Sequence, residues 1–208
     1  EFTDYAAAIK YVEQTGEAYA CKPCWDGADK SLSYVGKSPE DMIYMLDRWR
    51  RKGPPKGTFV MQTKVSGVEV GVGAWHGRDG FAGGWEENFE CKKLFPGDLG
   101  PTTGEMGTVM RYVQRSKLAD KVLRPLEGLL DRLGYVGNID VNCIVDEDGT
   151  PWPLEFTMRC GWPSTNIEME LFEVDPVEFW HGLARGSAPR KHHRMNEVAI
   201  GVVLAIPD

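Results

Sequence analysis

Residues 149–163 decide the fold, and their sequence is G-T-P-W-P-L-E-F-T-M-R-C-G-W-P. This stretch places a carboxylate, a hydroxyl and a guanidinium at alternate positions, in Glu155, Thr157 and Arg159. Residues two apart in an extended strand share a face. We therefore expect these three side chains to point the same way, on a face that can hold a metal ion and a polyphosphate.

The residues before this stretch complete a predicted β-hairpin. Asp148-Gly149 is a typical turn dipeptide, and the run from 138 to 145 is apolar and alternating. We expect this run to be the partner strand.

Composition limits the classes of protein that fit. The chain has 208 residues, of which 42% are hydrophobic and 26% charged, so it can bury a full core. A net charge of -7 argues against a general nucleic-acid or membrane-surface binder, whose affinity would depend on clustered Lys and Arg. We expect the short basic run at 189–194 to be a solvated linker.

The sequence also predicts a location. No apolar run reaches the roughly 18 residues of a membrane span, and the acidic start lacks the features of a signal peptide. The five cysteines form no disulfide framework, which fits a reducing compartment. We therefore expect a cytoplasmic protein with no membrane partner. Because the chain starts without Met, we expect a longer parent.

Periodicity and turn residues predict a mixture of helices and strands. We expect helices at 3–15, from 38 onward, at 116–133 and after Asp175-Pro176. We expect strands at 18–23 and 32–35, a pair at 58–63 and 68–75 joined by a turn at Ser66-Gly67, a strand near 80–86, a Gly/Pro/Thr loop at 96–107, and a last strand at 198–205. Without regular βαβ alternation, this order predicts an α+β fold with largely antiparallel sheets.

Two motifs carry a resemblance to a known family. The chain has E-F-T-M-R-C-G-W-P-S at 155–164, where that family has E-F-N-x-R-F-G-D-P-E. It has G-P-T-T-G-E-M-G at 100–107, where the family has G-P-N-T-G-G-M-G. In these motifs, and in their order and spacing, the chain resembles the ATP-grasp ligases, and within them the phosphoribosylamine–glycine ligases.

The resemblance implies an ATP-grasp fold in which two α+β lobes clamp a nucleotide. It implies a lid lobe at 1–64 and a catalytic lobe at 65–185. Residues 186–208 are then a linker and the start of a truncated C-terminal domain, and an N-terminal domain of the parent is missing.

The resemblance also implies residues that bind ATP. Lys22 is at the position of the strand lysine that reaches the phosphates, and Glu69 matches the acid that takes the ribose hydroxyls. An exposed strand-end lysine and an exposed edge-strand acid are the alternative readings. The residues implied to bind ATP are Lys22, Lys30, Gln62, Lys64, Val65 and Glu69.

A metal site follows from the same motif. Glu155 matches a ligand to one or two Mg2+ (or Mn2+) ions, which select oxygen donors. Thr157 stands where the family has Asn, and Asp140 and Asn142 could supply the missing oxygen or be ordinary hairpin residues. Arg159 matches the arginine beside the phosphates, and we expect it to act in catalysis together with Lys22.

The second motif matches the acceptor side of the family. Backbone N–H groups and hydroxyls there offer donors for a carboxylate or sugar phosphate. Trp162 and Ser164 replace an Asp and a Glu of the family, which indicates a different acceptor pocket. The residues implied to bind substrate are Lys92, Lys93, Gly100, Pro101, Thr102, Thr103 and Gly104.

The main functional hypothesis is an ATP-dependent carboxylate–amine ligase of purine biosynthesis. By the resemblance, a small carboxylate attacks ATP to give an acyl phosphate, and a small amine then displaces phosphate. A non-catalytic nucleotide-binding module is the alternative, favoured by the altered motif. A third hypothesis, from the C-x-x-C of Cys21 and Cys24, is a zinc or thiol-redox protein.

Overall fold

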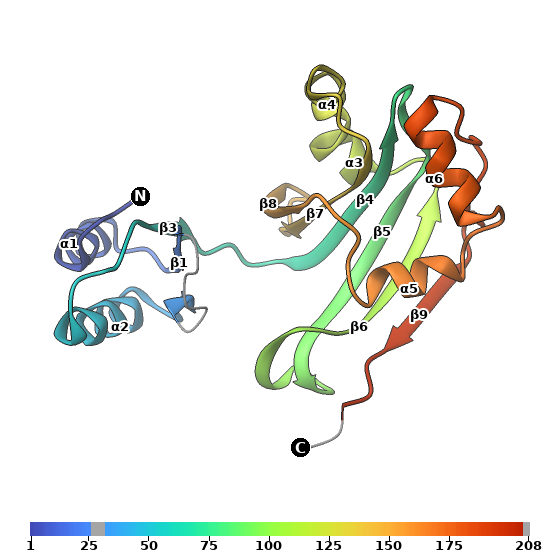
Figure 1. Cartoon of the computed structure of the whole chain (residues 1–208). Helices are drawn as coiled ribbons and strands as arrows, with labels where there is room; N and C mark the ends of the chain where they lie inside the picture. The colour runs from blue at the N-terminus through green and yellow to red at the C-terminus, as the bar shows by residue number, and fades with distance from the viewer. Residues whose placement is uncertain (26–31, 206–208) are drawn as a thin grey trace. The chain divides into compact units, whose positions relative to one another are not determined.

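The computed structural model describes residues 1–25 and 32–205, which fall into two compact units (Figure 1). The first unit spans Glu1–Val65 and the second spans Ser66–Asp208. Each unit has its own antiparallel sheet and its own hydrophobic core. The α+β class with antiparallel sheets, predicted from the sequence, is confirmed.

The first unit combines two helices with a three-stranded sheet in the order β2-β1-β3. Asp4 caps the first helix by accepting a hydrogen bond from the Ala7 N–H at 3.0 Å, and Ser38 caps the second by accepting one from the Asp41 N–H at 3.3 Å. The elements are α1 (Tyr5–Thr15), β1 (Tyr19–Pro23), β2 (Tyr34–Val35), α2 (Pro39–Lys52) and β3 (Phe59–Thr63).

The core of this unit forms where α1 and α2 pack on one face of the sheet. Tyr19 and Cys21 of β1 are buried in it, and the alternation of a strand puts Ala20 and Lys22 on the other face. The helices contribute buried side chains at helical spacing, which are Tyr5, Ala8, Val12, Met42, Leu46 and Trp49. Lys22 is therefore directed away from the core.

The second unit is built on a six-stranded sheet in the order β8-β7-β4-β5-β6-β9, with every neighbouring pair antiparallel. Its strands are β4 (Val68–Gly77), β5 (Gly80–Phe95), β6 (Leu99–Val113), β7 (Gly137–Val145), β8 (Pro151–Thr157) and β9 (Val198–Val202). The predicted hairpin of β7 and β8 is confirmed. The start of a further domain at 186 stays a prediction, and β9 is an edge strand of this sheet.

Helices cover both faces of this sheet (Figure 1). On one face, α3 (Lys117–Val122), η2 (Arg124–Leu126) and α4 (Glu127–Leu133) pack over fully buried Val72, Ala74 and Val141. On the other face lie α5 (Ser164–Met169) and α6 (Pro176–Arg185), with Ile167 in a cluster with Met110 and Leu183 in a cluster with Trp75. Part of this second face is left to polar residues.

The predicted pairing of the strands at 58–63 and 68–75 is wrong. Strand β3 pairs with β1, and β4 lies between β5 and β7 in the other sheet. The Ser66-Gly67 turn therefore connects the two units. Turn residues signal a change of direction, but they do not determine which strand becomes the partner.

The predicted single helix at 116–133 is also interrupted. It consists of α3, a 3-10 turn and α4, with Pro125 inside the turn. Proline has no N–H to donate and crowds the carbonyl four residues earlier, so the helical bonding breaks there. The break changes which residues face the core: Leu123 is fully buried, whereas Leu133, the last residue of the predicted helix, is exposed.

The basic run at 189–194 was expected to be solvated, and this is wrong for two of its members. His192 and His193 are fully buried. The His193 ring stacks on Tyr112 with centroids 3.7 Å apart, and the His192 ring lies 4.4 Å from that of Phe179. Their aromatic rings, rather than their charge, explain this placement.

Buried His192 should make the stability of the protein depend on pH. Burial and the neighbouring His193 lower the pKa of His192 to about 4. The unfolded chain takes up this proton near the ordinary value of about 6.5, so unfolding is favoured as the pH falls from about 7 to 4. We expect this residue to account for a loss of up to about 3 kcal/mol over that range.

Urea unfolding at pH 7.0 and 4.5 measures this effect. His192→Gln should reduce the difference in unfolding free energy between the two pH values, whereas His181→Gln, at an exposed position on α6, should leave it unchanged. An equal difference in the His192→Gln variant would contradict the assignment.

None of the helices described is both long and apolar enough to cross a membrane.

Candidate functional site: the polar face of the six-stranded sheet

The six-stranded sheet carries a set of polar residues on the face opposite α3 and α4, which we call the polar face. Residues directly opposite on antiparallel strands share a face. Gly73 lies between Glu86 and Asp140 in this way, and Gly71 lies between Asn88 and Asn142. The polar face consists of Glu69, Gly71, Gly73, Glu86, Asn88, Glu90, Thr108, Asp140, Asn142, Glu155 and Thr157.

Amide side chains connect the acids of the polar face. Asn88 Nδ2 donates to Glu86 Oε1 at 3.0 Å and to Asp140 Oδ2 at 3.1 Å. Asn142 Nδ2 donates to Glu90 Oε2 at 3.2 Å. These bonds fix the side chains of three neighbouring strands in one arrangement.

Two of the acids have strongly shifted proton affinities. Burial, together with the charges of Glu168 and Asp140, raises the pKa of Glu86 well above its ordinary value. Burial and the charge of Glu90 raise the pKa of Asp140 to about 7. Both shifts arise because a charged carboxylate loses hydration when buried and meets like charges nearby. The inner part of this face thus favours a cation or a proton.

Lys92 supplies positive charge at the outer end of the polar face. Its Nζ pairs with Glu69 and lies 3.4 Å from Glu90 Oε2. Burial alone would lower the pKa of Lys92, but the hydrogen bond and charge of Glu69 raise it above its ordinary value.

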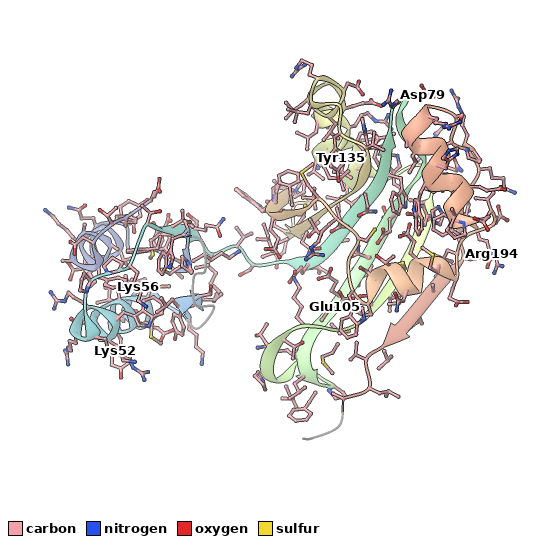
Figure 2. All side chains as sticks on the ribbon, in the orientation of Figure 1. Lys52, Lys56, Asp79, Glu105, Tyr135 and Arg194 are labelled. Atoms are coloured by element: carbon pink, nitrogen blue, oxygen red, sulfur yellow. The ribbon has the colours of Figure 1, made fainter. Side chains whose placement is uncertain are left out.

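A further acid, Glu105, lies on the β5–β6 hairpin (Figure 2) and hydrogen-bonds to Thr108. Burial raises the pKa of Glu105. Glu69 itself lies on β4, an interior strand of the sheet, so the alternative reading of Glu69 as an acid on an edge strand is wrong.

The expected Gly/Pro/Thr loop at 96–107 is largely strand. Lys93 and Thr102 face each other on β5 and β6, and Lys93 Nζ donates to Thr102 Oγ1 at 2.9 Å. Thr103 Oγ1 donates to the Lys92 carbonyl at 2.9 Å. Shifts in register around Lys93 keep this hairpin irregular. The predicted substrate residues Gly100, Pro101, Thr102, Thr103 and Gly104 all lie on β6.

The three side chains of Glu155, Thr157 and Arg159 were predicted to share one face of a strand. Only Glu155 and Thr157 lie on the strand. Strand β8 ends at Thr157, and exposed Arg159 follows it and donates from Nη1 to the Cys160 carbonyl at 3.1 Å. Across the hairpin, Glu155 is opposite Asn142 and Thr157 is opposite Asp140. The two predicted pairs of metal ligands therefore form one patch.

This patch fits a hard divalent cation. It offers two carboxylates, a hydroxyl and an amide, all oxygen donors of the kind that Mg2+ prefers. Within residues 1–25 and 32–205, no group of three or more His, Cys, Asp or Glu is arranged to hold a metal. Any ion here therefore depends on the amide and hydroxyl, and on ligand oxygens, as well as on Glu155 and Asp140.

The remaining expected ATP residues lie mainly on the first unit. Lys22 and Gln62 share the face away from the helices, because Lys22 pairs with Val60 and Gln62 with Ala20 in register. Lys64 follows β3 and donates its N–H to the Ala18 carbonyl at 2.9 Å. Val65 is the last residue of this unit, and Lys30 lies outside the described residues.

The C-x-x-C pair does not offer a redox or zinc environment. Cys21 is buried in the core and Cys24 is exposed. Burial, with a smaller effect of Cys24, raises the pKa of the Cys21 thiol to about 12, whereas both chemistries need the thiolate. This argues against the third hypothesis.

Sequence reasoning missed the part of the polar face on β5. Glu86 and Asn88 lie in W-E-E-N-F-E-C-K, where polar residues occupy alternate positions through Glu90 and Lys92. This period of two was the available signal. It was hidden because the strand was predicted to end near residue 86.

The comparisons with known proteins agree with this architecture. No family model matches the chain. A phosphoribosylamine–glycine ligase of Listeria innocua is 25% identical over 98% of this chain and 50% of that protein. The chain thus spans about half the length of the curated relatives it matches.

Solved structures show the same fold. A phosphoribosylamine–glycine ligase from Thermotoga maritima matches 99% of this chain and 54% of that chain, with a TM-score of 0.70 and 23% identity. An N5-carboxyaminoimidazole synthetase from Staphylococcus aureus, complexed with ADP, matches 96% and 49%, with a TM-score of 0.60 and 13% identity. The chain therefore has an ATP-grasp fold and resembles the phosphoribosylamine–glycine ligases over nearly all of its length.

Proposed function

We propose that the chain serves an ATP-dependent carboxylate–amine ligase similar to phosphoribosylamine–glycine ligase, a reaction of purine biosynthesis. The observation that carries this proposal is the patch of Glu155, Thr157, Asp140 and Asn142 on the sheet of an ATP-grasp fold. The similarity to phosphoribosylamine–glycine ligases over 98% of the chain supports it. The test is ADP release from ATP in the presence of small carboxylates and amines.

In this proposal the patch holds Mg2+ (or Mn2+) and the phosphates of ATP. A divalent ion held by these residues would supply charge neutralisation for phosphoryl transfer. Glu155 contributes the exposed carboxylate, and Thr157 a neutral hydroxyl. Asn142 and Asp140 are held in place by Glu90 and Asn88, so their oxygens need little reorganisation.

The acceptor substrates are assigned to the β5–β6 hairpin and its two lysines. Lys92 and Lys93 offer ammonium groups for a carboxylate or phosphate, and Thr102 and Thr103 offer hydroxyls. Arg159 is exposed just beyond β8, where its guanidinium can neutralise charge on a transferred phosphoryl group. Positioning and charge, rather than a protein nucleophile, accomplish this chemistry.

For the first unit we propose contacts to ATP from Lys22, Gln62, Lys64 and Val65. The support is the resemblance together with the sharing of one sheet face by Lys22 and Gln62. Glu69 of the second unit is proposed for the ribose. Its pairing with Lys92 means that ribose hydroxyls would compete with an ammonium group for this carboxylate.

Lys22→Ala should weaken ATP binding. Loss of a cation beside the phosphates is expected to raise the Kd at least about tenfold, or about 1.4 kcal/mol. Calorimetric titration with a non-hydrolysable ATP analogue and Mg2+ measures the change. Lys10→Ala, at an exposed position on α1, is the matched control, and an unchanged Kd for Lys22→Ala would remove this residue from the site.

A nucleotide-binding module without catalysis is the second candidate. Thr157, Trp162 and Ser164 favour it, because they replace an amide and two acids of the ligase motif. ATP binding by calorimetry, combined with no ADP release from any mixture of carboxylates and amines, would select this candidate over the ligase.

A further inference from the structure

A pocket of about 600 Å3 lies at the end of the six-stranded sheet where β4 turns into β5. It shares no lining residue with the polar face. Its walls are the β4–β5 turn, α4 and the segment between α4 and β7, and Asp79 and Tyr135, labelled in Figure 2, both line it. The charged and titratable side chains of its lining, apart from Tyr135, are His76, Arg78, Asp79, Glu127 and Asp131. Acids therefore outnumber bases in this pocket.

His76 is buried in the wall of the pocket, with 1% of its surface exposed. Its Nδ1 lies 2.8 Å from the Tyr135 carbonyl oxygen, which can only accept a hydrogen bond. We therefore place the ring proton on Nδ1, which leaves a lone pair on Nε2 in the neutral ring. Metal-binding histidines are commonly held in this way, because the bond from the other ring nitrogen fixes the tautomer and orients the ring.

The protein makes no use of the lone pair on His76 Nε2. Within the described residues this atom has no hydrogen-bond partner, although Asp131 Oδ1 lies only 3.3 Å away. The carboxylate oxygen therefore lies off the direction in which the ring nitrogen would donate. Two electron-donating atoms thus lie side by side at the pocket, and no hydrogen bond joins them.

The separation of these two atoms matches that of two ligands of one metal ion. Zn2+ binds His nitrogen at about 2.0–2.1 Å and carboxylate oxygen at about 2.0–2.2 Å in tetrahedral geometry, which puts such a pair about 3.3–3.5 Å apart. An ammonium group fits less well, because two of its N–H bonds, in tetrahedral directions, reach acceptors about 4.6 Å apart. Imidazole nitrogen also selects Zn2+ and similar transition metals over Mg2+, which prefers oxygen alone.

A further carboxylate lies one helical turn away. Glu127 and Asp131 are four residues apart on α4, and both line the pocket. Like charges at this spacing on a helix repel each other. In the part of the chain that the structure describes, neither acid forms an ion pair with Lys or Arg. A cation in the pocket would offset this repulsion.

We propose that His76 Nε2 and Asp131 are two ligands of a site for a divalent transition-metal ion of the Zn2+ class. Water completes the coordination, and Glu127 contacts the ion through one such water. Two direct ligands agree with the finding that, over residues 1–25 and 32–205, no group of three or more His, Cys, Asp or Glu is arranged to hold a metal. Binding should therefore be weaker than at structural zinc sites with four protein ligands. The site does not depend on the proposed ligase function.

NMR of the histidine rings in the whole chain tests the site without ATP turnover. Long-range 1H–15N spectra at pH 7.5 should show the proton of His76 on Nδ1. Zn2+ should then shift the Nε2 signal and leave Nδ1 protonated. Excess Mg2+ fills the proposed Glu155 patch, and the exposed thiols are alkylated beforehand because thiolates bind Zn2+. A proton on Nε2 before Zn2+ is added, or no response of His76 at about 1 mM Zn2+, would overturn the proposal.

Two variants locate the ion. Asp131→Asn removes a charged ligand from a side chain that is 53% exposed, so the fold should tolerate it. The Kd for Zn2+, measured from the His76 signal, should rise at least about tenfold. Asp98→Asn makes the same change at an exposed turn position with φ of 58°, a conformation that Asn adopts readily, and should leave the Kd unchanged. An unchanged Kd in Asp131→Asn would refute the site.

Discussion

Glu155→Gln is expected to abolish ADP release, lowering the rate by at least about a hundredfold. The carboxylate of Glu155 is exposed on β8 and opposite Asn142, and we propose that it is a ligand of the metal ion. The amide of Gln keeps the shape but removes the charge, and metal-assisted charge neutralisation provides several kcal/mol of transition-state stabilisation. The rate of ADP release from ATP, in the presence of Mg2+ and small carboxylates and amines, measures the loss of activity.

The matched control is Glu147→Gln, which makes the same change at an exposed position in the turn of the same hairpin. This variant should keep full activity. Binding of ATP by calorimetry and the unfolding midpoint of each variant separate lost metal binding from lost folding. Full activity in Glu155→Gln would contradict its assignment as a metal ligand.

Local signals in the sequence predicted much of the fold. Helix α1 spans Tyr5–Thr15, close to the expected helix at 3–15, and is capped by Asp4 and Gly16; the β7–β8 hairpin turns at Asp148-Gly149, as expected. In each case a capping or turn residue, with the periodic residues beside it, determines where the helix ends or where the hairpin turns. Such features depend on neighbours in the chain, so no knowledge of distant contacts was needed.

Non-local pairing could not be predicted in the same way. Strand β3 pairs with β1 about 40 residues earlier in the chain rather than with β4. Burial of His192 and His193 likewise depends on Tyr112 and Phe179, which the sequence does not place beside them. The spacing of hydrophobic residues and the charge of a segment indicate its secondary structure and polarity. They do not identify which distant residues pack against it.

In the candidate site, too, local sequence signals predicted some residues, and non-local strand pairing added the others. The motif identified Glu155 and Thr157, and the hairpin placed Asn142 and Asp140 opposite them. Glu86 and Asn88 join this group only because β5 extends to Phe95 and lies beside β4. The register of a neighbouring strand, which no local pattern specifies, therefore completed the polar face.

Glu168→Ala is expected to destabilise the second unit by about 3–5 kcal/mol. Glu168 is 97% buried on α5, and its Oε1 accepts hydrogen bonds from Trp75 Nε1 and the Tyr112 hydroxyl, each at 2.6 Å. His193 Nε2 lies 3.1 Å from the same oxygen. Truncation leaves two buried donors without a partner and opens a cavity, and both effects are costly.

Urea unfolding followed by circular dichroism measures this change, and two further variants interpret it. Glu168→Gln keeps an oxygen in place for Trp75 and Tyr112, so it should cost less than Glu168→Ala. Glu170→Ala removes an exposed acid at the end of the same helix and should change the unfolding free energy by no more than about 0.5 kcal/mol. If Glu168→Ala were as mild as Glu170→Ala, the buried acceptor would not be holding α5 against the sheet. Because Glu168 touches Tyr112, which is opposite Glu86 in register, its loss should also disturb the inner end of the polar face.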